Sequence, residues 1–211
     1  KDSLYYSDNN VSTRAGISIS YATQNIIKKL NKGEFGFLID SDMFLISNFS
    51  VLKYMELNDI AGIYQNRENI DYFTNQLFLF KIKNIKEENL KYINFMPRKI
   101  NNINIDCGAD LYYLLKDQKD LEIKKLYDII HNDTINNIKK LKKDNKLITD
   151  YFENDLKIVR KTYKECNGDI GYHGELYEKV FLHFRAGTNW REGIKYSERT
   201  INLFNYLDNL I

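Results

Sequence analysis

The sequence predicts an α/β fold in which a mixed sheet is flanked by helices. Short apolar runs at 35–39, 60–64 and 76–82 are typical of strands. Between them lie segments whose apolar residues recur at helical spacing, at 18–30 and from about 50 to 57. Because strands and helices alternate along the chain, the α/β class is the one expected.

The apolar run at 35–39 is the first informative strand. It shows no polar alternation, which is typical of a strand buried on both faces in a parallel sheet, so an edge position would contradict this expectation. Asp40 and Asp42 follow it, and the period of two along an extended chain puts both on one side. Two carboxylates roughly 4 Å apart repel by about 1 kcal/mol in water. They therefore favour a divalent cation, Mn²⁺ or Mg²⁺, which prefers oxygen ligands.

The other expected elements follow the same patterns. Residues 1–16 have the polar composition of a loop, Gly33 ends the first helix, and Asn48 or Ser50 can cap the second. The remaining expectations are short or amphipathic segments. They are a helix at 86–92, a strand at 103–107, a helix at 109–115, two or three amphipathic helices at 116–165, a strand at 180–183 and a helix at 197–210.

Length and composition limit the class of protein. A chain of 211 residues, 43% hydrophobic, suits a single domain over 1–211, with 116–165 as a charged helical insertion. A net charge of +2 gives no reason to expect nucleic acid as a partner. The sequence shows no apolar window long enough for a transmembrane segment. Cys107 and Cys166 are too few for a disulfide framework, so a cytoplasmic location is expected.

A histidine at the end of an apolar run is the second informative feature. His183 can complete an oxygen site for Mn²⁺ through a neutral imidazole. Arg185 can form a bidentate pair with phosphate oxygens, and Gly187 permits close backbone approach. Asn189 and Trp190 would shape the pocket or stack on a sugar. The alternative stays open that His183 is a buried structural residue bonded to backbone carbonyls.

Two further groups of residues are candidates for acid–base chemistry and for acceptor binding. Asp106 and Asp110 flank a glycine, and burial would raise the pKa of either carboxyl toward that of a general base for a sugar hydroxyl. The alternative is that one of them caps the helix beginning near Ala109. His173 and Glu175 stand in a glycine-rich stretch, where they are loop residues or contact an acceptor, and Glu175 also competes as the base.

The sequence Asp40-Ser-Asp42 after Phe-Leu-Ile, together with His183-Phe-Arg-Ala-Gly-Thr-Asn-Trp190, resembles nucleotide-sugar glycosyltransferases of the GT-A fold. In that family an Asp-x-Asp motif holds Mn²⁺ or Mg²⁺ and the diphosphate of the donor. The resemblance implies that Asp42 binds the metal, that Asp40 contacts the metal or the ribose, and that His183 is a third ligand. It also implies a diphosphate contact for Arg14. More loosely, the chain is similar to glycosyltransferase-like proteins of large DNA viruses.

The chain departs from the family pattern in two places. The stretch after His183 is similar to the HxxGxxKPW element of glycogenin-like transferases, but here Gly187 is four and Trp190 seven residues after the histidine, without the Lys-Pro pair. Only 39 residues precede Asp40, where the family has two βα units that bind the nucleotide base. The resemblance therefore implies an amino-terminally truncated chain that lacks the first βα units.

The function implied is metal-dependent transfer of a sugar from a nucleotide-diphosphate donor to a hydroxyl of a glycan, a protein or a lipid. The expected donor contacts are Arg14, Asp40, Arg185, Gly187, Asn189 and Trp190. His173 and Glu175 are expected at the acceptor, and Asp106 or Asp110 as the catalytic base. One alternative is a non-catalytic carbohydrate-binding relative of the same fold. A haloacid-dehalogenase-type phosphatase is less favoured, because Phe44 stands where that motif continues with Thr or Val.

Overall fold

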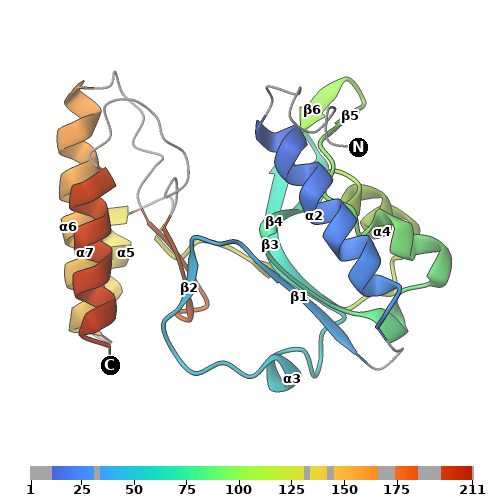
Figure 1. Ribbon diagram of the computed structural model, residues 1–211, viewed down its shortest axis with the longest axis horizontal. Helices are drawn as coiled ribbons and strands as arrows, with labels where there is room; N and C mark the ends of the chain where they lie inside the picture. The colour runs from blue at the N-terminus through green and yellow to red at the C-terminus, as the bar shows by residue number, and fades with distance from the viewer. Residues whose placement is uncertain are drawn as a thin grey trace. The chain divides into compact units, whose positions relative to one another are not determined.

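The computed structural model describes residues 11–30, 34–130, 134–141, 145–165, 174–184 and 196–210 (Figure 1). It divides into two compact units, described here one at a time. Unit 1 comprises residues 1–40 and 50–127, and unit 2 comprises residues 41–49 and 128–211. The predicted α/β class is confirmed, because a mixed sheet of parallel and antiparallel strands is flanked by helices.

The sheet of unit 1 contains the three strands expected from the apolar runs. Its order is β1 (Phe35–Ile39), β4 (Ile70–Lys81), β3 (Ile60–Arg67) and β7 (Ile123–Leu126). β4 is antiparallel to both β1 and β3, so β1 and β3 run in the same direction. β3 and β4 are longer than expected and form a hairpin, whose two-residue turn places Glu68 and Asn69 at positive φ.

Strand β1 lies at the edge of this sheet in the described part of the chain, and its described neighbour β4 is antiparallel. The expectation of a strand buried on both faces in a parallel sheet is therefore wrong. Only one face packs: Gly36 lies under the ring of Phe80, where a Cβ would come within 2.1 Å of the ring. On the other face Phe37 and Ile39 are 39% and 43% exposed. These two residues are apolar although they are exposed, so the unbroken apolar run in the sequence does not mean that both faces of the strand are buried.

Two helices cover the same face of the sheet in unit 1: α2 (Val11–Ile27) and α4 (Leu111–Asp117) (Figure 1). Ile27 of α2 and Leu114 of α4 pack in one core with Phe78 and Phe80 of β4. α2 begins well before the helix expected at 18–30, so residues 11–16 are not a loop. The smaller elements are α3 (Val51–Tyr54), η1 (Ile82–Asn84), η2 (Glu87–Tyr92) and the hairpin β5 (Arg98–Ile100) and β6 (Ile103–Ile105).

Strand β7 replaces the first of the helices expected at 116–165. Its sequence Ile-Lys-Lys-Leu has no strand alternation, and its position depends on contacts with the start of β3. The backbone N–H of Asp59 donates to the carbonyl of Glu122 at 2.7 Å, and the Asp59 carboxylate accepts from the N–H of Glu122 at 3.0 Å. These bonds align β7 parallel to β3.

Unit 2 packs a small antiparallel sheet against helices. The strands lie in the order β2 (Met43–Leu45), β9 (Phe181–His183), β8 (Glu175–Tyr177), and the helices are α5 (Thr134–Leu141), α6 (Lys146–Glu165) and α7 (Tyr196–Asp208). α6 and α7 lie side by side (Figure 1). Leu176 and Leu182 enter the core formed with these helices. The strand and the last helix expected at 180–183 and 197–210 are thus confirmed as β9 and α7.

Within the described ranges, no helix has both the length and the apolar character that crossing a membrane requires.

Candidate functional site

The register of the β8–β9 hairpin brings Glu175 and His183 directly opposite each other. Leu176 and Leu182 also form a pair and face the helices. Because successive side chains of a strand point to opposite faces, Glu175 and His183 project from the other face. His183 also pairs with Met43 of β2, the residue after Asp42. The strand alternation and the register of β2, β8 and β9 therefore bring the side chains of Asp42, Glu175 and His183 together.

The resulting cluster is called the His183 site and consists of Asp42, Glu175, Tyr177 and His183. Nδ1 of His183 lies 2.6 Å from Oε2 of Glu175, and the Tyr177 hydroxyl donates to the same oxygen at 2.9 Å. On the other side of the ring, Nε2 lies 3.2 Å from Oδ1 of Asp42. All four residues are buried, with His183 only 3% exposed.

The charges of the His183 site favour a protonated imidazole. Burial lowers the pKa of His183, but its contacts with the carboxylates of Asp42 and Glu175 outweigh that effect and raise the pKa to about 9. The alternative of a structural histidine bonded to backbone carbonyls does not describe these contacts, because both ring nitrogens face carboxylates.

One oxygen of the His183 site lacks a hydrogen-bond donor. Oδ1 of Asp42 is buried without a hydrogen bond, since the 3.2 Å contact with Nε2 of His183 does not have hydrogen-bond geometry. The protonated ring of His183 compensates the charge of this carboxylate, and a cation that replaced the Nε2 proton would give the oxygen a direct partner.

The Asp42 and His183 atoms fit a divalent cation. Two adjacent ligands of an octahedral cation with bonds of about 2.1 Å lie about 3 Å apart, close to the observed separation. A carboxylate on the second ring nitrogen, here Glu175, is the usual partner of a metal-bound histidine. Among the described residues no group of three or more His, Cys, Asp or Glu side chains is arranged to hold a metal ion, so a cation at this pair would take its other ligands from water and phosphate oxygens.

The expectation that an extended chain places the carboxylates of Asp40 and Asp42 on one side of a strand is wrong. Ser41 and Asp42 form a turn, and the chain then enters the second sheet at Met43 instead of extending β1. Asp40 is the last residue of the first segment of unit 1, where its backbone N–H donates to the carbonyl of Gln76 at 2.8 Å and its side chain is half-buried. Asp42 belongs to unit 2, so the structure describes the two carboxylates with different units.

A buried ion pair supports both strands of the His183 site. Nε and Nη2 of Arg199 in α7 bind the carboxylate of Asp155 in α6 at 2.7 and 3.2 Å. The same carboxylate accepts from the N–H of Gly174 at 2.7 Å, directly before β8. The guanidinium also lies over the ring of Phe184, 4.7 Å from its centroid and directly after His183. The helix pair therefore fixes the ends of the segments that carry Glu175 and His183.

The two candidate bases lie in unit 1 in different surroundings. Asp110 is buried and forms an ion pair with Arg98, and burial raises its pKa more than the guanidinium lowers it. It occupies the N-cap position of α4 without a capping hydrogen bond from its side chain, so it is not the expected cap. Asp106 is exposed and accepts from the N–H of Cys107 at 2.8 Å, one residue on.

The remaining predicted residues have mixed outcomes. Arg14 lies in α2 of unit 1 and is half-buried. Glu175 is the first residue of β8 and does not lie in a loop, and its carboxylate contacts Nδ1 of His183 within unit 2. Tyr177 was not predicted, although the pattern Glu-Leu-Tyr is a strand alternation that places it on the same side as Glu175. The residues outside the described part are His173, Arg185, Gly187, Asn189 and Trp190.

Comparison with protein-family models, with curated proteins and with solved structures finds no match for this chain. A functional conclusion therefore depends on the chemistry of the residues described above.

Proposed function

We propose that this protein is a metal-dependent glycosyltransferase that moves a sugar from a nucleotide-diphosphate donor to a hydroxyl acceptor. The observation that carries the proposal is the 3.2 Å contact between Oδ1 of Asp42 and Nε2 of His183. These residues are far apart in the sequence, and the resemblance to GT-A enzymes implies both as ligands of the same metal. The oxygen without a donor on Asp42 and the carboxylate behind His183 support the same assignment.

The chain's own residues prepare the site for Mn²⁺ or Mg²⁺. Oδ1 of Asp42 and Nε2 of His183 would hold the cation, which would replace the Nε2 proton that the imidazolium carries without metal, while Glu175 would keep the proton on Nδ1. Tyr177 fixes the orientation of the Glu175 carboxylate through its hydroxyl. A cation bound there supplies positive charge that stabilises a departing diphosphate.

The two candidate bases of unit 1 can be compared with each other. A base must reach the proton that it removes, so accessibility matters before pKa. Asp106 is exposed, whereas Asp110 is buried against Arg98. Within unit 1, Asp106 is therefore the more accessible of the two carboxylates.

A turnover assay tests the proposed function. The protein is incubated with Mn²⁺ and a panel of nucleotide sugars, and release of nucleoside diphosphate is measured. Asp42→Asn should lower the rate by about 100-fold or more, because a ligand and a charge next to the diphosphate are lost. Asp150→Asn, which removes a surface carboxylate of α6, is the matched control and should retain the rate.

The other outcomes separate the rival functions. Binding of a nucleotide sugar without turnover would indicate a carbohydrate-binding relative. Release of phosphate from a phosphomonoester, with no reaction of any nucleotide sugar, would indicate a phosphatase. Either result would contradict the transferase proposal.

A further inference from the structure

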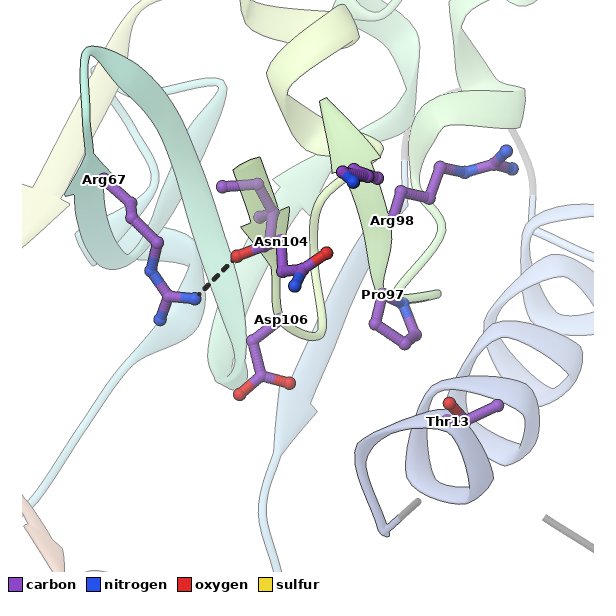
Figure 2. A pocket seen from close by; sticks show the side chains of 8 residues that line it. Thr13, Arg67, Pro97, Arg98, Asn104 and Asp106 are labelled. Atoms are coloured by element: carbon purple, nitrogen blue, oxygen red, sulfur yellow. Dashed lines mark hydrogen bonds between the residues drawn. The ribbon is translucent and has the colours of Figure 1, made fainter. Parts of the chain in front are cut away.

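Unit 1 contains a polar cavity of about 470 Å³, shown in Figure 2. This volume lies within the range of small-molecule sites, about 300–1,000 Å³. The residues that line it are Thr13, Arg67, Pro97, Arg98, Lys99, Asn104, Ile105 and Asp106. Arg67 is the last residue of β3 and pairs with Ile70 at the tip of the β3–β4 hairpin, beyond the level at which β1 ends opposite Leu77. The cavity is therefore at the tip of this hairpin, beside β5 and β6, which supply Arg98, Lys99 and Asn104.

The cations of the cavity differ in how far their charge is compensated. Arg98 forms an ion pair with the buried Asp110, and Figure 2 shows its guanidinium pointing away from Arg67. Nη1 of Arg67 donates to the carbonyl oxygen of Asn104 at 2.8 Å, which fixes the guanidinium but uses only one of its N–H groups. Lys99 is exposed and also lines the cavity. Two cations, Arg67 and Lys99, thus accompany a single exposed carboxylate, Asp106.

Tight backbone geometry shapes two walls of the cavity. The β5–β6 hairpin turns through Asn101 and Asn102, both at positive φ, in a two-residue loop. Behind Asp106, Gly108 has φ +102 and lies so close to β4 that a Cβ would come within 1.9 Å of the Phe73 carbonyl oxygen. A preformed cavity loses little free energy to ordering when a ligand binds.

We propose that this cavity binds an acidic sugar, a hydroxyl-bearing ring with one carboxylate or phosphate group. Arg67 and Lys99 would pair with the anionic group, for which a guanidinium provides a planar, bidentate donor. The Asp106 carboxylate would accept from a ring hydroxyl, and the side-chain amide of Asn104 both donates and accepts. The cavity thus offers cations for one end of the ligand and an acceptor for its hydroxyl groups.

Titration by calorimetry tests this proposal with three probes: glucuronate, glucose 6-phosphate and glucose. EDTA is present throughout, so the result does not depend on the proposed metal. Charge-assisted hydrogen bonds contribute enough that at least one acidic probe should bind about tenfold or more tightly than glucose. Binding of glucuronate alone would assign a carboxylate ligand, and binding of glucose 6-phosphate alone a phosphate ligand.

Variants assign the binding to the cavity. Arg67→Gln and Lys99→Gln should each lower the affinity for the acidic probe about tenfold. Two variants are used so that a folding defect in one of them does not decide the result. Lys157→Gln removes an exposed lysine of α6 in unit 2 and should leave the affinity unchanged. Three results would overturn the proposal. They are equal binding of glucose, unchanged affinity in both variants, or no binding of any probe up to about 10 mM.

Discussion

The two ring nitrogens of His183 face carboxylates that we assign to different roles. Asp42 offers an oxygen without a hydrogen bond on the Nε2 side, whereas Glu175 is already bonded to Nδ1 and to Tyr177. Glu175 is therefore a positioning residue. It fixes the tautomer and the direction of the imidazole without contacting the metal itself.

Replacing Glu175 by Gln should weaken Mn²⁺ binding while leaving the ligand atoms in place. Loss of such an outer carboxylate typically lowers metal affinity by about 10–100-fold. Electron paramagnetic resonance of free Mn²⁺ measures this affinity directly. Glu153→Gln, at a half-buried position of α6, is the control and should bind as the unchanged protein does. An affinity in Glu175→Gln within twofold of the control would remove the positioning role.

Cys107 is buried directly after Asp106. Burial and the neighbouring Asp106 raise the pKa of the Cys107 thiol to about 12. At pH 8 the thiolate would then be about one molecule in ten thousand, against roughly one in four for a thiol of ordinary pKa. Since the thiolate is the reactive form, alkylation should be roughly 1,000-fold slower than in the unfolded chain and should accelerate as the pH rises.

The Cys107 rate is measured with iodoacetamide on a Cys166→Ser variant, which leaves Cys107 as the only thiol. The same variant in guanidinium chloride provides the rate for an accessible thiol. Rates that agree within about tenfold between the two states would contradict the buried, protonated thiol.

At the scale of elements, the Asp155–Arg199 pair connects α6 and α7 to both strands of the His183 site. The side chains of both residues are 0% exposed. Removing one member leaves a buried charge without its partner, so Asp155→Leu should lower the free energy of unfolding by about 3–5 kcal/mol. The double variant Asp155→Leu with Arg199→Met should lose less, because no unpaired charge remains. Urea denaturation followed by circular dichroism tests this order, and a double variant less stable than the single one would contradict it.

Gly36 of β1 pairs with Phe80 of β4 and lies against its ring. Gly36 has no room for a side chain beneath Phe80, so Gly36→Ala should destabilise the protein by about 1–3 kcal/mol through overpacking. Adding Phe80→Leu to Gly36→Ala should recover part of that loss, since the shorter side chain makes space. Ile39→Ala, at a 43% exposed position of the same strand, is the control with a small effect. Strictly additive losses in the double variant would show that the two positions do not interact.

For the molecule as a whole, the sequence predicts the α/β class and the existence of most elements. Periodicity reveals a strand such as 35–39, but it does not reveal whether both faces of that strand are covered. Phe37 and Ile39 show this limit, because they are apolar and exposed. β7 was missed because its parallel pairing with β3 depends on long-range bonds from Asp59, which no local pattern encodes.

The candidate site was predictable in the same partial way. Asp42 and His183 carry motif signals, and the structure places them side by side, while their roles as metal ligands stay a prediction. The position of Glu175 depends on the β8–β9 turn, in which Glu178 and Lys179 adopt positive φ without a glycine to indicate it. No local pattern indicates that turn, so the sequence alone places Glu175 in a loop instead of opposite His183.

Calorimetric titration of the intact protein with Mn²⁺ tests the metal centre most simply. One site should appear. It should be lost in Asp42→Ala and in His183→Ala, because each variant removes a ligand atom of the same pair, and it should be retained in Asp150→Asn. Mn²⁺ binding that is unchanged in both ligand variants, or absent from the unaltered protein, would contradict the metal centre and the glycosyltransferase proposal that depends on it.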